Sequence, residues 1–127
     1  MLAHARAVHP EECCGFLAGA GGAATHHFPL LNALASPTAY EVEPRELLRA
    51  QREFRALGIG EVALYHSHPT SAPIPSDTDL SRNGYGESIP HVIVGPGAEV
   101  QAWWLGEKNY EEAEWEVEGE PTVSTVG

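Results

Sequence analysis

Residues 65–80 read YHSHPTSAPIPSDTDL, and this stretch decides how the rest of the chain must fold around it. Two histidines, His66 and His68, are separated by one residue, and Asp79 follows them after a proline-rich loop. Imidazole and carboxylate groups are the usual protein ligands of a catalytic zinc ion. If the residues before the loop form a strand, both histidines point to the same face, because side chains two residues apart in a strand do so. A single ion could then bind both.

Asp79 is expected near the two histidines because residues 76–80, SDTDL, are typical of a helix N-terminus. Ser76 can cap such a helix, with Asp79 in the first turn and Asp77 as a solvated neighbour favoured by the helix dipole. Prolines in the preceding loop hold this helix end near the strand end at low entropic cost. Two imidazoles and one carboxylate leave the fourth position of a tetrahedral zinc site to water, the arrangement of a catalytic site.

Hydrolysis at such a site also needs a general base, usually a glutamate that does not bind the metal. The candidates are Glu11 and Glu12, which precede a short apolar run. A shift of one residue in a strand turns a side chain to the opposite face. The residues alone therefore leave the choice between the two glutamates open.

Length and composition exclude several classes of protein. At 127 residues the chain fits one domain, spanning residues 1–127, with a core that needs no structural metal. The net charge of −11 argues against a nucleic-acid partner. Cys13 and Cys14 are adjacent, so a disulfide between them would close no useful loop. With no signal peptide and no apolar run long enough for a membrane span, we expect a cytoplasmic protein without a membrane partner.

Hydrophobic patterning predicts one mixed, mostly antiparallel sheet flanked by helices, an α/β sandwich. Helices are expected at residues 2–8 and 44–57, and the second has Pro44 at its start and Gly58 after its end. Strands are expected at residues 12–18, 25–31, 40–42, 61–68, 91–95, 100–106 and 112–119. We expect the first two strands to form a hairpin and the last to be an edge strand with one wet face.

The motif resembles the JAMM or MPN+ metalloprotease family, also called Mov34/MPN/PAD-1. Its pattern is Glu-x-x-Gly on an early strand, then His-x-His-Pro, six residues, Ser, two residues and Asp, and this chain matches every spacing. The resemblance covers nearly the whole chain and implies a single-domain, cytidine-deaminase-like MPN sandwich of the small, stand-alone prokaryotic type. It also implies zinc held by His66, His68 and Asp79, a catalytic base at Glu12, and Ser76 stabilising the oxyanion.

What the resemblance implies for function is a zinc hydrolase with zinc-bound water as nucleophile. It would cleave a peptide, isopeptide or amide bond after the C-terminal Gly-Gly of a ubiquitin-like or sulfur-carrier protein. The short chain favours the sulfur carrier, since it has little room for the insertions of eukaryotic deubiquitinating members. We expect the Gly-Gly end to lie along an exposed strand edge. The alternatives are a small-peptide metallopeptidase and a non-catalytic MPN scaffold.

Several other residues have simpler interpretations. No acid or cysteine follows His26 and His27 at ligand spacing, and these two histidines are expected in structural or surface positions, as are His4, His9 and His91. A zinc deaminase would need His-x-Glu and Pro-Cys-x-x-Cys motifs, which this chain lacks. Trp103 and Trp104 are expected to face opposite sides of a strand. Ser76 could serve only as a helix cap, and iron or cobalt could bind the same ligands as zinc.

Overall fold

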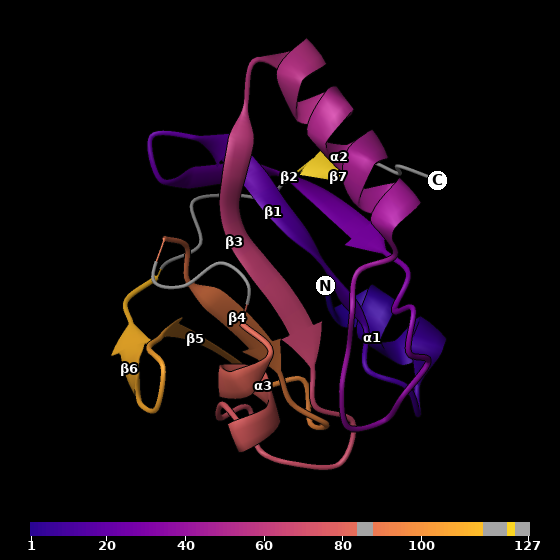
Figure 1. The fold of residues 1–127 in the computed structure, drawn as a ribbon, viewed down its shortest axis with the longest axis vertical. Helices are drawn as coiled ribbons and strands as arrows, with labels where there is room; N and C mark the ends of the chain where they lie inside the picture. Colours follow the sequence, from indigo (N-terminus) through magenta and orange to yellow (C-terminus); the bar gives the residue numbers. More distant parts are fainter. Residues whose placement is uncertain (84–87, 116–121, 124–127) are drawn as a thin grey trace.

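The computed structural model describes residues 1–83, 88–115 and 122–123, which form one seven-stranded mixed sheet with helices on both faces (Figure 1). Along the sheet the strand order is β6-β5-β4-β3-β1-β2-β7. The strands are β1 (Cys14–Ala20), β2 (Ala23–Leu30), β3 (Gly60–Ser67), β4 (His91–Val94), β5 (Val100–Leu105), β6 (Tyr110–Ala113) and β7 (Thr122–Val123). β3 pairs with β4, and β2 with β7, in parallel, and the other neighbours are antiparallel. The predicted mixed α/β sandwich is confirmed.

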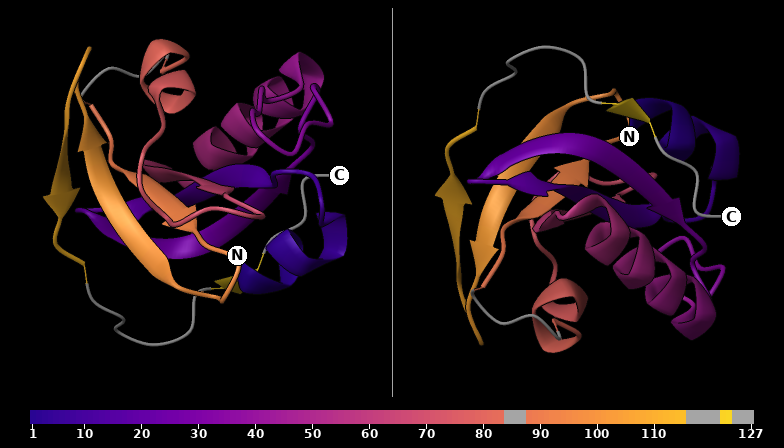
Figure 2. Two further views of the ribbon diagram at one scale, coloured as in Figure 1. Left: turned by 90° about the horizontal axis from the view of Figure 1, so that it is seen from below. Right: turned by 90° about the horizontal axis from the view of Figure 1, so that it is seen from above.

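Helix α2 (Pro44–Leu57) and helix α3 (Asp77–Ser81) lie on one face of the sheet (Figure 2). The apolar side of α2 supplies Ala50 and Phe54, which pack against Phe16, Phe28 and other side chains of the central strands. The helix ends where predicted, because Gly58 adopts the left-handed conformation (φ 70°) that closes a helix. In the described part of the chain, no helix combines the length and the apolar character that crossing a membrane requires.

Helix α1 (Leu2–Val8) covers the opposite face of the sheet (Figure 2). Its residues Ala5 and Val8 pack against a second buried cluster that includes Cys13 and Tyr65. Cys14, by contrast, belongs to the core beneath α2. The two cysteines therefore face opposite sides of the sheet, and both are buried free thiols.

Two predicted strands differ from the structure. Residues 40–42 form no strand beyond a single bridge between Val42 and Asn32, because the Asn32 side chain binds this loop directly: its amide donates to the Ala39 carbonyl and its oxygen accepts from the Glu41 amide. The last predicted strand, 112–119, begins earlier, since a turn after β5 pairs Tyr110 with Leu105. Residues 116–119 lie outside the described part of the chain.

A buried polar cluster joins α1 and β2 to the central strand β3. The Tyr65 hydroxyl, on a side chain with 0% exposure, lies 2.7 Å from Nδ1 of His4 and 2.6 Å from Nε2 of His27. Burial lowers the pKa of His27 to about 4 and raises the pKa of Tyr65, so both groups are neutral at pH 7. The phenol can donate to one imidazole and accept from the other. His4 and His27 thus have the structural role expected of them.

We expect Tyr65→Phe to lower the free energy of unfolding by roughly 1–3 kcal/mol, because it leaves two imidazole nitrogens beneath α1 without their partner. Urea denaturation at pH 7 measures the change. Tyr110→Phe is the matched control, since Tyr110 is 45% exposed. A loss below about 0.5 kcal/mol, the usual range of a surface substitution, would show that the cluster does not stabilise the fold.

Candidate functional site

The two histidines of the motif lie at the C-terminal end of β3, an inner strand between β1 and β4. His66 is fully buried and His68 nearly so. Although β3 ends at Ser67, the His68 amide still donates to the Val94 carbonyl, which keeps His68 in line with the strand. Both side chains consequently face the α2 and α3 side of the sheet, and their Nε2 atoms are 3.2 Å apart.

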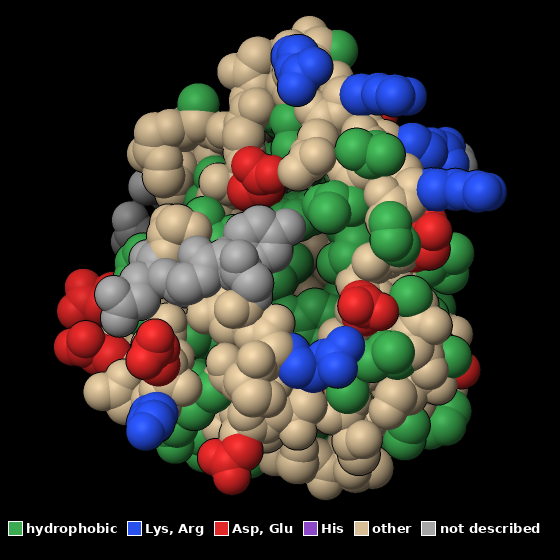
Figure 3. All heavy atoms as spheres, in the orientation of Figure 1, with side chains coloured by type: hydrophobic (Ala, Val, Ile, Leu, Met, Phe, Trp, Pro, Cys, Tyr) green, Lys and Arg blue, Asp and Glu red, His purple; other side chains and the backbone are tan. Residues whose placement is uncertain are grey.

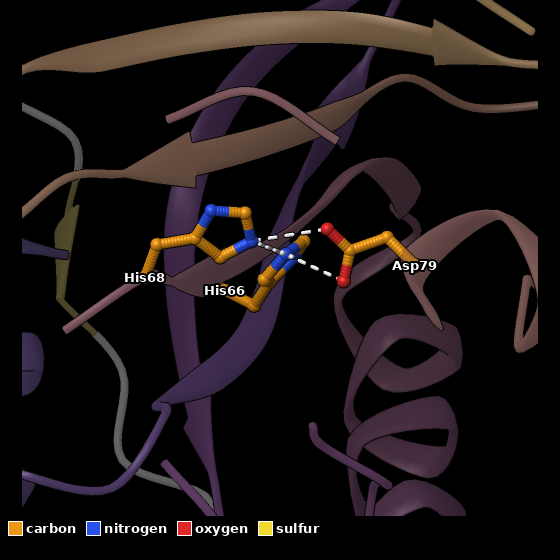
Figure 4. A group of neighbouring side chains, drawn as sticks. All are labelled: His66, His68 and Asp79. Carbon is orange, nitrogen blue, oxygen red and sulfur yellow. Dashed lines mark hydrogen bonds and ion pairs between the residues drawn. The ribbon is translucent and has the colours of Figure 1, made fainter. Parts of the chain in front are cut away.

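Helix α3 brings Asp79 to the histidines by means of its own N-cap. The Ser76 hydroxyl accepts from the Asp79 amide (3.1 Å), and the Asp79 carboxylate accepts from the Ser76 amide (2.9 Å). This reciprocal capping box fixes the first turn of the helix. Asp79 Oδ1 then lies 3.2 Å from His66 Nε2, and Oδ2 lies 3.0 Å from His68 Nε2 (Figure 4).

Two side chains, His68 and Trp103, hold the loop between β3 and α3 through hydrogen bonds to its carbonyl groups. Nδ1 of His68 is 2.8 Å from the Ala72 carbonyl, and the indole of Trp103 on β5 donates to the Pro73 carbonyl at 2.8 Å. Trp103 is buried and Trp104 is 40% exposed, as the alternation of a strand predicts. The sequence did not indicate that Trp103 would hold this loop.

The donor set fits a metal ion. A carbonyl can only accept, so Nδ1 of His68 carries a proton, and Nε2 of His68 faces the Asp79 carboxylate. Burial acts to raise the pKa of Asp79, but hydrogen bonds with His66 and His68 outweigh it and lower the pKa, so the carboxylate is ionised. Once their Nε2 atoms are deprotonated, both imidazoles and the carboxylate can donate lone pairs to one cation. Ligands about 2.0–2.1 Å from a tetrahedral ion are roughly 3.3 Å apart, close to the separations of these atoms.

Glu12 lies beside this cluster with a carboxyl group that is almost completely buried. Its Oε1 has no hydrogen-bond partner. Burial, and secondarily the charge of Asp79, raises the pKa of Glu12 to about 8, while His68 acts in the opposite direction. Glu11 is more exposed, so the structure places Glu12 and not Glu11 beside the cluster. Asp77 is exposed, as expected.

A groove of about 350 Å³ between α2 and α3 leads to this cluster, and Figure 3 looks onto that face. Its lining includes Asp79, Leu47 of α2, Tyr40 and His91. Tyr40 stacks on His66 with ring centroids 4.7 Å apart, and His91 is buried with neither ring nitrogen hydrogen-bonded. The sequence did not indicate that Tyr40 and His91 lie at the site, because the residues next to them along the chain belong to no recognisable motif.

Within the described residues, one group of three metal-binding side chains has its ligand atoms close together: His66, His68 and Asp79. The histidines outside the motif do not form a second group of this kind in that part of the chain. The sequence predicted that His66 and His68, and not the other histidines, belong to a possible metal site, and the arrangement of the side chains agrees with this prediction.

The sequence of this chain is similar to a protein family and to several characterised proteins. Residues 1–106 match the model of the prokaryotic homologs of the JAB domain. A CysO-cysteine peptidase from Mycobacterium tuberculosis is 42% identical over 82 residues, which are 63% of this chain and 56% of that protein. A desampylase from Haloferax volcanii is 35% identical over 116 residues, 85% of this chain and 83% of that one. The match thus spans little more than half of the mycobacterial peptidase.

The fold is also found among solved structures. The solution structure of a protein from Desulfitobacterium hafniense matches with a TM-score of 0.78 and 27% identity. The match covers 98% of this chain and 85% of that one. The arrangement of strands and helices is therefore shared along nearly the whole chain.

We expect Trp103→Phe to loosen the loop that delivers Asp79, because the buried Pro73 carbonyl loses its donor. Hydrogen exchange of the Ser76 amide, which is bound to Asp79, should become faster than in the wild-type chain. Trp104→Phe, on the opposite face of the same strand, is the matched control. Unchanged exchange of the Ser76 amide in Trp103→Phe would show that the indole does not hold the loop.

Proposed function

This chain belongs to the family of prokaryotic homologs of the JAB domain, as its motif predicted, and we propose that it is a zinc-dependent hydrolase of the JAMM type. The proposed substrate is a ubiquitin-like or sulfur-carrier protein, cleaved after its C-terminal Gly-Gly. Similarity to proteins named CysO-cysteine peptidase and desampylase supports this class of substrate. The observation that carries the proposal is the buried cluster of His66, His68 and Asp79.

The three side chains of this cluster would hold zinc through His66 Nε2, His68 Nε2 and the Asp79 carboxylate. When bound, zinc supplies Lewis acidity, which polarises a carbonyl group and activates water. The Ala72 carbonyl fixes the His68 tautomer, and the Ser76 amide orients the Asp79 carboxylate. Such partners of the ligands keep the donor atoms directed at one point.

Glu12 would transfer the proton, and Ser76 would stabilise the negative charge that develops on the carbonyl oxygen. Glu12 would take a proton from the attacking water and pass it to the leaving nitrogen. The Ser76 hydroxyl oxygen already accepts from the Asp79 amide, while its own hydrogen remains available to donate. It can therefore cap α3 and also donate to the oxyanion of the tetrahedral intermediate.

The α2–α3 groove offers the tail of a substrate a more direct route than a strand edge does. β3 is an inner strand, and the strands at the edges of the sheet, β6 and β7, are each three strand positions away. At about 4.8 Å per strand, a tail paired with either edge would lie roughly 14 Å from the histidines. We therefore propose the groove as a binding place for the Gly-Gly end, as an alternative to the expected strand edge.

A non-catalytic scaffold is the competing function, and Glu12 argues against it. A buried carboxyl oxygen without a partner costs about 1–3 kcal/mol of stability, which a scaffold would have no reason to retain. We further propose that residues 1–127 form one JAMM domain. The free, buried thiols of Cys13 and Cys14 suit a reducing compartment such as the cytoplasm.

We expect about one zinc ion per chain in the wild-type protein, and loss of that zinc in His68→Ala, measured by mass spectrometry of the purified proteins. Asp77→Ala, which removes an exposed acid from the same segment, should retain it. Glu12→Gln should also retain zinc but should not cleave a ubiquitin-fold carrier extended by one amino acid beyond Gly-Gly.

Three outcomes separate the alternatives in this experiment. Zinc with cleavage of short Gly-Gly peptides but not of the carrier would point to a small-peptide metallopeptidase. Zinc with no hydrolysis of either substrate would favour the scaffold. Zinc retained by His68→Ala would contradict the ligand set.

We expect Ser76→Asp to keep the N-cap of α3 and yet to lower kcat by about 10²–10³-fold, because aspartate caps a helix well but cannot donate to an oxyanion at neutral pH. Thermal unfolding and zinc content monitor the cap and the metal site, and carrier cleavage monitors catalysis. Ser76→Gly should cost little stability as a cap. Activity in Ser76→Asp that matches the wild type would leave Ser76 with capping as its sole role.

A further inference from the structure

Basic residues are concentrated on one helix of a strongly acidic chain. The chain has 7 lysines and arginines against 18 acids. Four of the seven lie on α2 and are exposed to solvent: Arg45, Arg49, Arg52 and Arg55. Figure 3 shows basic side chains in a row over α2, and a group of acidic side chains at the opposite margin of this face, with other charged side chains of both signs between them. The main concentration of positive charge on this face thus lies over α2.

The four arginines share the outward side of α2. Their spacing of three and four residues places them on one helix face, with Leu48 among them. Leu48 is 55% exposed, so the face combines positive charge with an apolar centre. We call Arg45, Leu48, Arg49, Arg52 and Arg55 the arginine face. Arginine is enriched at protein interfaces, where a central apolar contact and a charged surround are common.

The arginine face keeps an excess of positive charge. Helix α2 carries four arginines and two acids, Glu46 and Glu53. Glu46 is directed to the Leu31 amide, and Glu53 stands at the spacing of a helical pair with Arg49. The outward side of α2 therefore retains a net positive charge that a partner can contact.

The position of α2 links the arginine face to the proposed site. Leu47 of this helix lines the same groove as Asp79 of α3. A folded protein resting on the outward side of α2 could direct an extended C-terminal tail over Leu47 toward the cluster. The helix would then act both as the wall of the groove and as the support for the body of the substrate.

We propose that the arginine face docks the folded body of an acidic ubiquitin-like carrier. The identity of the carrier fold rests on the proposed function, and its negative charge follows from the arginines. The net charge of −11 repels an acidic protein at most orientations, so the arginine face favours the one that brings the tail to the groove. A basic carrier would be attracted instead to the acidic margin, where Glu111 and Glu112 are exposed on β6.

The test measures binding in Glu12→Gln, so that the carrier is not consumed. The probe is an acidic ubiquitin-fold carrier ending in Gly-Gly, and a second version has lysines in place of its surface acids. Arg49→Glu with Arg52→Glu should raise the Kd for the acidic carrier about tenfold at low salt. The difference should vanish near 1 M salt, where the screening length is about 3 Å. The control, Arg6→Glu with Lys108→Glu, makes the same change of net charge elsewhere.

The outcomes distinguish docking on the arginine face from a general effect of net charge and from self-association of the chain. Equal weakening in the control pair, or tighter binding of the lysine version to the unmodified arginine face, would overturn the proposal. So would salt-sensitive self-association, seen by light scattering, that is lost in Arg49→Glu with Arg52→Glu, since the occupant would then be a second copy of the chain. Arginine-dependent binding of a carrier that the wild-type chain does not cleave would support docking while contradicting the proposed function.

Discussion

The structure depends on the buried contact between His66, His68 and Asp79. Their separations of 3.0 to 3.2 Å place two imidazoles against an ionised carboxylate where little water can screen its charge. In a low-dielectric interior a carboxylate is costly without a partner. The surrounding fold must therefore hold the three groups close together.

Restraint of the site comes from several distant parts of the chain. Asp79 is held by the cap of its own helix, His68 by a loop carbonyl, and His66 by stacking against Tyr40. Trp103, on β5, fixes the loop that connects the strand to the helix. Each of these contacts limits a motion that would separate the three side chains. Most of the chain thus serves to keep a short motif rigid.

The sequence predicted the parts of this arrangement that are local. The His66 and His68 pair, the Ser76 cap and the helix at 44–57 follow from spacing within single elements, and the structure agrees with each. Tyr40, Trp103 and His91 could not be predicted, because their contacts join residues far apart in sequence. Residues 40–42 were wrongly expected to form a strand, since the pattern did not reveal that the Asn32 side chain binds this loop.

Strand β3 shows why the site and the stability of the fold cannot vary independently. His66 and His68 face Asp79, whereas Tyr65 and Ser67 face α1, and the Ser67 hydroxyl accepts from the Cys13 amide at 2.8 Å. The Ser67 amide also donates to the Cys13 carbonyl, so two hydrogen bonds fix the register next to Glu12. A slip of one residue would turn Tyr65 and Ser67 toward Asp79 and both histidines away from it. The hydrogen bonds of Ser67, on the side of β3 that faces α1, therefore determine where Glu12 lies relative to His68.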